Sequence, residues 1–314
     1  MYTLSDLKFA AQSPKSVVRE LNRLGHTRLR SQDYNSDGIC VLDEDWDNLI
    51  ILDACRYDLF AERSDLPGTL EGRISRAGAT QEFIRSNFAN RHLHDTVYLT
   101  ANSWLHRLKD EIDAEVYKLI DLHLEDPDGR YHDDDFKVVP PGVMTKRAAE
   151  IVEKYPNKRL VIHYIQPHHP FMGPTGREHF QHRTAFMNEM IDESDDITPQ
   201  LVRQAYVENL DIVLSSVADL LPSLPGKTVI SADHGEMVGE RHDFVPVRDY
   251  GHHPGIYNNS LTRIPWHVVE NGSRKRIVSE TPEDDAEVDV ELLTKRLIDL
   301  GYKLNHPSVR EAED

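Results

Sequence analysis

The sequence has few cysteines, no long apolar run and fewer basic than acidic residues. Cys40 and Cys55 are too few for a disulfide scaffold and do not form a C-x-x-C pair. No apolar run approaches transmembrane length, and the opening MYTLSDLKFAAQSPKSVVREL carries charges every few positions, unlike a signal peptide. These absences predict a soluble protein of the reducing cytoplasm, whose substrate can still be membrane-borne.

The charge balance is strongly acidic. Lys and Arg number 36 against 54 Asp and Glu, which gives a formal net charge of −18. Such a protein repels polyanions on average, which argues against nucleic-acid binding. A small anionic ester is not excluded, because a bound metal ion reverses the field locally. The acidity fits either an ordinary cytosolic enzyme or adaptation to a salt-rich interior.

The 314 residues, 39% of them hydrophobic, suffice for one large core with additions. We expect a helical arm at 1–45, a catalytic domain at 46–280 and a C-terminal helix and tail at 281–314. The segment 101–142 interrupts the domain with turn-forming and acidic residues, which predicts an insertion beside the site.

A short helix is predicted in the arm. Pro14 suits a first helical turn and Gly25 a helix end. Between them, Val17, Val18 and Leu21 form a small apolar face. We expect this helix to pack on the body of the protein; docking to a membrane surface or a partner is the alternative.

Strand-like and helix-like patterns alternate through the centre of the chain. Short apolar runs of the buried-strand type lie at 48–53, 96–100, 159–165 and 227–233. Helical patterns lie at 81–88, 143–155 and 198–221. This alternation predicts an α/β fold, a doubly wound, mainly parallel sheet with helices on both faces.

Polar residues end two of the apolar runs. Asp53 is the last residue of NLIILD, and Asp233 is the last residue of KTVISAD. His234 directly follows Asp233. Ligands of such a sheet bind outside the carboxyl ends of its strands, where these side chains would converge. Carboxylates with an imidazole suit Zn²⁺ or Mn²⁺, with Ca²⁺ or Mg²⁺ as alternatives. A single aspartate at a strand end is more often a cap or turn former.

The segment ADHGEMVGER resembles the D-H-G-E-x-x-G-E motif of sulfatase-like and phosphoethanolamine-transferase-like members of the alkaline phosphatase superfamily. NLIILDACRYD resembles their opening strand with its first ligand. The resemblance leaves out 1–45, 101–142 and the tail. It implies an alkaline phosphatase-like fold and a divalent metal held by Asp53, Asp233 and His234.

The superfamily places its nucleophile after the first strand, where this chain has RAGATQEFIRSNF. Thr80 stands before a helical pattern, so it would lie at a helix N-terminus that favours an anion. We expect Thr80 to be the nucleophile, activated by the metal, with Ser75 in reserve. The alternative is that Thr80 serves only as an N-cap.

Histidine pairs follow two later strands. HYIQPHHPFMGP resembles the substrate-side segment of the superfamily, and GHHPG resembles a late segment that returns a histidine to the site. We expect the two segments to meet, with His169 and His253 in catalysis and His168 and His252 in substrate binding. A second metal site is an alternative role for them. His163, within a strand, is expected to be a core histidine.

Two further features narrow the chemistry. Arg56 is predicted either to bind an anionic oxygen or to pair with Asp58. Neither cysteine lies in the C/S-x-P-x-R motif that sulfatases mature to formylglycine, so phosphate esters rank above sulfate esters. The sequence thus predicts a metal-dependent hydrolase or transferase acting on a small-molecule, glycan or lipid-linked anionic ester. A catalytically silent relative that binds a glycan, lipid or protein is the alternative.

Overall fold

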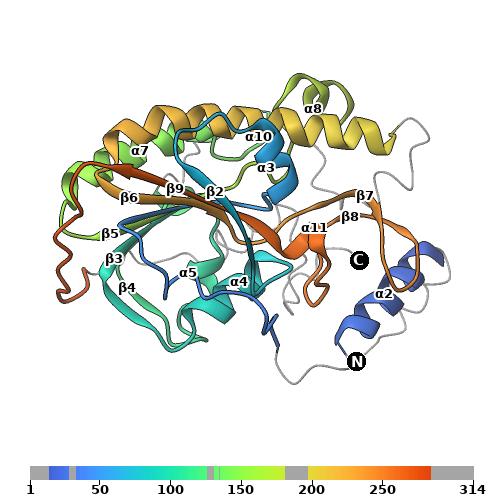
Figure 1. Cartoon of the computed structure of the whole chain (residues 1–314), viewed down its shortest axis with the longest axis horizontal. Helices are drawn as coiled ribbons and strands as arrows, with labels where there is room; N and C mark the ends of the chain where they lie inside the picture. The colour runs from blue at the N-terminus through green and yellow to red at the C-terminus, as the bar shows by residue number, and fades with distance from the viewer. Residues whose placement is uncertain (1–13, 28–32, 126–130, 134, 181–196, 284–314) are drawn as a thin grey trace, which may run out of the picture.

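The computed structural model describes residues 14–27, 33–125, 131–133, 135–180 and 197–283, and a seven-stranded sheet forms its centre (Figure 1). In spatial order the strands are β2 (Thr69–Ile74), β9 (Arg263–Asn271), β6 (Gly226–Ala232), β1 (Asn48–Leu52), β5 (Arg159–Tyr164), β3 (His92–Thr100) and β4 (Glu115–Asp121). The strands from β6 to β4 pair in parallel, whereas β9 is antiparallel to both of its neighbours. The predicted mainly parallel sheet is confirmed.

Helices cover both faces of the sheet because its central strands are apolar on both sides. Ile50 and Leu52 of β1 belong to a core shared with α7 (Pro141–Lys154) and α10 (Pro199–Leu220). Leu49 and Ile51, which alternate with them, belong to a core shared with α4 (Thr80–Phe88) and α5 (Trp104–Leu108). This two-sided burial confirms the doubly wound α/β class.

The remaining described elements lie outside the central sheet and the four helices named above. They are the helices α2 (Pro14–Thr27), α3 (Tyr57–Arg63), α6 (Leu122–Glu125), α8 (Pro174–His179) and α11 (Asn259–Thr262), the 3₁₀ turn η1 (Leu221–Ser223), and the hairpin strands β7 (Met237–Arg241) and β8 (Arg248–Gly251). None of the helices that the structure describes is long and apolar enough to cross a membrane.

The segment 101–142, predicted to be an insertion, contributes an edge strand to the main sheet. β4 pairs in parallel with β3 and so extends the same core. The predicted C-terminal helix and the rest of the tail after 283 lie outside the described residues.

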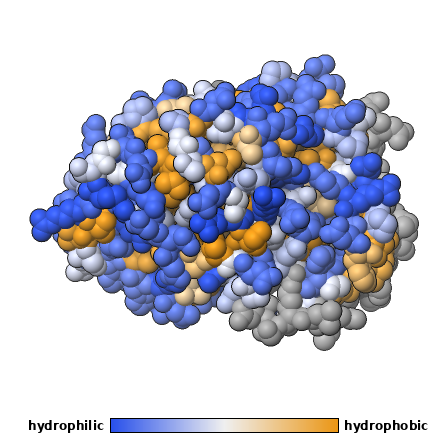
Figure 2. Space-filling model, in the orientation of Figure 1, coloured by the Kyte–Doolittle hydropathy of each residue, from blue (hydrophilic) through white to orange (hydrophobic). Residues whose placement is uncertain are grey.

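The helix of the predicted arm packs on the hairpin. The Asn22 amide exchanges hydrogen bonds with the backbone of Val245, and Arg19 forms an ion pair with Asp249, Nε to Oδ1 3.1 Å. Val17 and Leu21 remain partly exposed, at 38% and 50%. Figure 2 shows hydrophilic side chains over most of the viewed face, with small apolar patches between them.

Candidate metal centre and active site

Parallel pairing places the predicted ligands beside one another. β1 and β6 are neighbours, and Leu52 lies opposite Ala232 at the last paired position. Asp53 and Asp233 therefore leave adjacent strands at the same edge of the sheet. Gly235 follows His234 where a Cβ atom would lie 2.1 Å from the carbonyl oxygen of Ser260, so this position requires glycine.

One donor atom from each of Asp53, Asp233 and His234 lies within 4.8 Å of the other two. Nε2 of His234 is 3.2 Å from Oδ2 of Asp233 and 3.6 Å from Oδ1 of Asp53. All three side chains are completely buried. The structure thus brings together the three residues that the sequence predicted to share one ion.

In Asp53 and Asp233, one carboxylate oxygen accepts hydrogen bonds and the other accepts none from the described residues. Asp233 Oδ1 accepts hydrogen bonds from the backbone N–H groups of Ala54 and His234, and Asp53 Oδ2 accepts one from the Asn102 amide at 2.6 Å. Among the described residues, Asp53 Oδ1 and Asp233 Oδ2 have no hydrogen-bond donor. Buried, unpaired carboxylate oxygens beside an imidazole fit a divalent cation.

The electrostatics of the cluster agree with this fit. Burial and the Asp233 charge raise the pKa of Asp53 well above its usual range. Although burial opposes the imidazolium, the Asp233 carboxylate raises the pKa of His234 to about 9. Without a metal, protons therefore balance the buried negative charge. A divalent ion supplies that balance with both carboxylates ionised and His234 neutral.

Thr80 is the first residue of α4, and the N-cap is Ala79. The alternative that Thr80 is only an N-cap is therefore wrong. Its Oγ1 atom is buried and lies 3.2 Å from Nε2 of His234. The predicted nucleophile thus lies against a predicted ligand at a helix N-terminus, where backbone N–H groups favour an anion.

Ser75, the reserve nucleophile, has a structural environment. Its buried hydroxyl donates to the backbone carbonyl of Asp233 and accepts from the N–H of Ala77 at 3.1 Å. The hydroxyl therefore holds the segment before α4 against the end of β6.

Arg56 forms ion pairs with Asp58 (2.7 Å) and with Glu240. The alternative of pairing with Asp58 is what the structure shows. Anion binding by Arg56 stays a prediction, and it would compete with these two carboxylates.

A second cluster combines His168, Glu236 and His252, whose donor atoms also lie within 4.8 Å of one another. The ring centroids of His168 and His252 are 5.0 Å apart, and those of His252 and His234 are 4.3 Å apart. This cluster therefore adjoins the first. The two histidine segments meet, as predicted from the sequence. Burial lowers the pKa of both His168 and His252, which favours the neutral imidazole that binds metals.

The other member of each histidine pair faces different partners. The His169 ring stacks on His168 with centroids 4.1 Å apart. Nε2 of His253 lies 3.2 Å from Oδ2 of Asp249. The structure thus places His168 and His252, rather than His169 and His253, in the cluster beside the carboxylates.

Residues not singled out from the sequence support the site. Glu236 belongs to the DHGE motif quoted above, which was the available signal. Asn102 holds Asp53, and no sequence pattern marked it. His163, expected in the core, is buried with Nδ1 2.7 Å from the Tyr98 hydroxyl and Nε2 4.0 Å from Asp233 Oδ2. It therefore lies directly behind a predicted ligand.

Comparisons with known proteins find no matching protein-family model and no matching curated protein. A similar solved structure is the integral membrane protein lipooligosaccharide phosphoethanolamine transferase A from Neisseria meningitidis, at 13% identity and a TM-score of 0.46 over 71% of this chain. The match covers 47% of that protein, so the present chain spans about half its length.

For two further solved structures, the match covers a larger share of the other protein's chain. The C-terminal periplasmic domain of a phosphoethanolamine transferase from Campylobacter jejuni is 14% identical, with a TM-score of 0.45, over 71% of this chain and 78% of that chain. A phosphonate monoester hydrolase from Silicibacter pomeroyi is 13% identical, with a TM-score of 0.40, over 81% and 72%. At these identities and scores the three structures do not establish an activity, which has to come from the site.

Proposed function

We propose that this protein is a metal-dependent hydrolase or transferase that acts on phosphate or related esters, sulfate included, with Thr80 as the nucleophile. The observation that carries the proposal is one buried cluster in which Asp53, Asp233, His234 and Thr80 meet, with carboxylate oxygens that lack hydrogen-bond donors among the described residues.

Asp53, Asp233 and His234 would hold a divalent ion, Zn²⁺ or Mn²⁺ by ligand chemistry, with Ca²⁺ or Mg²⁺ as alternatives. His168, Glu236 and His252 would hold a second one beside it. When bound, such ions neutralise the charge of an ester oxygen and ease deprotonation of a nearby hydroxyl.

The protein residues supply the rest of the reaction. Thr80 gives its hydroxyl proton to solvent and attacks phosphorus in line, so that an oxygen–phosphorus bond forms as the bond to the leaving oxygen breaks. The N-terminus of α4 binds the transferred anionic group. Water, or an acceptor alcohol in a transferase, then displaces the Thr80 oxygen.

The leaving oxygen needs a proton, and we propose that His253 provides it. Its ring pairs with the buried Asp249 carboxylate, the arrangement that orients a histidine for acid–base chemistry. The ring of His169 forms no hydrogen bond with a carboxylate of the described residues. This favours His253 over His169 as the general acid.

Phosphate is favoured over sulfate because neither Cys40 nor Cys55 lies in the C/S-x-P-x-R motif that sulfatases mature to formylglycine. We propose a small-molecule, glycan or lipid-linked anionic ester as substrate and the cytoplasm as location, the latter from the sequence composition alone.

The direct test is a reconstitution screen. Protein stripped with a chelator receives Zn²⁺, Mn²⁺, Mg²⁺ or Ca²⁺ and is assayed on phosphate monoesters, phosphate diesters and sulfate esters. We expect metal-dependent cleavage of a phosphate ester, lost in Thr80→Ala and kept in Thr69→Ala, a control at an exposed position of β2. A metal-free protein inactive on every ester would favour the silent binding protein instead.

A further inference from the structure

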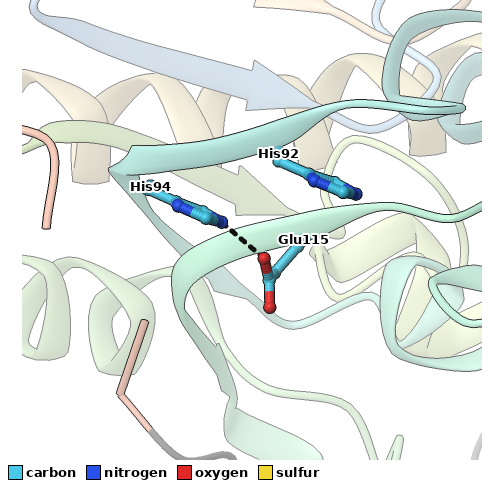
Figure 3. Close-up of side chains that lie close together, drawn as sticks. All are labelled: His92, His94 and Glu115. Carbon is cyan, nitrogen blue, oxygen red and sulfur yellow. Dashed lines mark hydrogen bonds and ion pairs between the residues drawn. The ribbon is translucent and has the colours of Figure 1, made fainter. Parts of the chain in front are cut away.

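A third group of metal-binding side chains lies away from the candidate active site. His92 and His94 belong to β3, and Glu115 begins β4. One donor atom from each of the three side chains lies within 4.8 Å of the other two. Figure 3 shows the two imidazoles and the carboxylate together, with His94 bonded to Glu115.

The strand geometry brings these side chains to one place. Alternate residues of a strand point to the same face, so His92 and His94 share a face of β3. Their rings are nearly parallel, at 2° and 6.0 Å between centroids. Parallel pairing of β3 with β4 sets His92 opposite Glu115.

The local backbone is fixed on several sides. The N–H of Glu115 donates to the carbonyl of Arg91 at 2.9 Å, and Asn90 N–H donates to Ile112 at 2.8 Å. The carbonyl of His94 accepts from Lys158 Nζ and from the N–H of Glu280. The side chains therefore project from a preorganised edge, which lowers the entropic cost of binding an ion.

We propose that His92, His94 and Glu115 form a surface site for a divalent transition-metal ion, with Zn²⁺ as the expected occupant. Two imidazoles and one carboxylate are a known zinc ligand set, whereas Mg²⁺ and Ca²⁺ prefer oxygen ligands throughout. The His92, His94 and Glu115 side chains are 53%, 33% and 49% exposed, so water can complete the coordination.

Asp113 supports the same site. Its Oδ1 atom lies 3.2 Å from Nε2 of His92. A carboxylate bonded to one ring nitrogen of a metal-binding histidine orients the imidazole and makes its other nitrogen a better ligand. Asp113 is thus a positioning residue for His92.

This site is separate from the candidate active site. β3 runs nine residues from His92 to Thr100, roughly 26 Å at about 3.3 Å per residue. The active-site residues follow the carboxyl ends of the parallel strands, whereas His92 and Glu115 stand at the amino ends of theirs. A metal bound here links the first residues of β3 and β4 and stabilises that edge of the sheet.

The test is a zinc titration of the full chain with a competing chromophoric indicator. We expect His92→Gln/His94→Gln to lose one zinc equivalent per chain relative to wild type. His179→Gln, which changes another exposed histidine, should keep it. Asp233→Asn should also keep this equivalent, so that failure of the active-site proposal and failure of this one give different results.

Two further measurements guard against a misfolded variant. Asp113→Asn keeps both histidines and should weaken the zinc affinity of this site by roughly ten- to a hundredfold. Zinc should raise the melting temperature of the wild type more than that of the double variant, and Mg²⁺ should not separate them. Equal zinc stoichiometry and affinity in the wild type and the double variant would overturn the proposal.

Discussion

The hydroxyl of Thr80 and the Nε2 atom of His234 lie 3.2 Å apart although 154 residues separate them in the chain. One begins α4 and the other follows β6, so both stand at the edge of the sheet where parallel strands end. The contact joins the predicted nucleophile to a predicted metal ligand.

Replacing Thr80 should stop turnover without unfolding the protein. Thr80→Ala removes the attacking oxygen, and the three predicted metal ligands remain, so we expect a loss of at least about a thousandfold in kcat. Thr80→Ser keeps a hydroxyl and should retain partial activity. Steady-state kinetics and metal analysis of the same samples check this. Full activity in Thr80→Ala would remove Thr80 from the mechanism.

Asp233→Asn should separate metal binding from local structure. An asparagine oxygen can still accept from the N–H groups of Ala54 and His234, so the backbone contacts survive. The lost charge should weaken the metal and lower turnover by at least about a hundredfold. Melting curves with and without metal give the measurement. Metal should stabilise the wild type by more than the variant, and equal stabilisation would contradict the assignment.

The two histidine segments should respond differently to leaving-group chemistry. His252→Ala should slow an activated aryl ester and a poor alkyl ester alike, because a lost metal ligand affects both. His253→Ala should slow the alkyl ester much more, because only that leaving oxygen needs a proton donor. His179→Ala serves as the surface control. Identical profiles for the His252 and His253 variants would refute this division of roles.

Asp121 should make stability depend on pH. Burial raises the pKa of this aspartate from 3.8 to about 6. The folded state therefore disfavours the charged form of Asp121. The contribution of neutral Asp121 to the free energy of unfolding is complete below about pH 4 and is lost as the pH rises through about 6. Asp121→Asn should be more stable than wild type by about 2 to 3 kcal/mol at pH 8 and equal near pH 4.

Urea unfolding at the two pH values measures this difference. Asp110→Asn changes a highly exposed aspartate and should show no such pH-dependent gain. A constant difference between Asp121→Asn and wild type at both pH values would show that the carboxylate does not titrate as described.

The sequence predicted the central strands well and the sheet margins poorly. β1 and β6 are almost entirely buried, their sequences contain short apolar runs, and an aspartate directly follows each strand. Both the strands and their site residues could therefore be predicted. β2 reads TLEGRI and is largely exposed, because it lies at an edge and lacks the apolar pattern of a buried strand. β4 was not predicted, because it lies within the segment 101–142, whose turn-forming and acidic residues indicated an insertion.

Within the site, the sequence predicted which residue types take part, but not which way the histidine side chains point. The DHGE motif indicated Asp233 and His234, and the proline-bounded histidine pairs indicated the two segments that meet. Which histidine of each pair faces the cluster depends on how the backbone turns after each strand. Adjacent identical residues carry no signal for that choice, so His168 and His252 emerged only from the three-dimensional arrangement.

Complete burial of Asp53, Asp233 and His234 has a consequence for the kinetics of metal exchange. An ion enclosed there can leave only when the covering side chains open, so its residence time follows the free energy of that opening. An ion on His92, His94 and Glu115 faces solvent and needs no such opening. Brief treatment with a chelator should therefore empty the surface position first, leaving a form with the reaction centre still loaded.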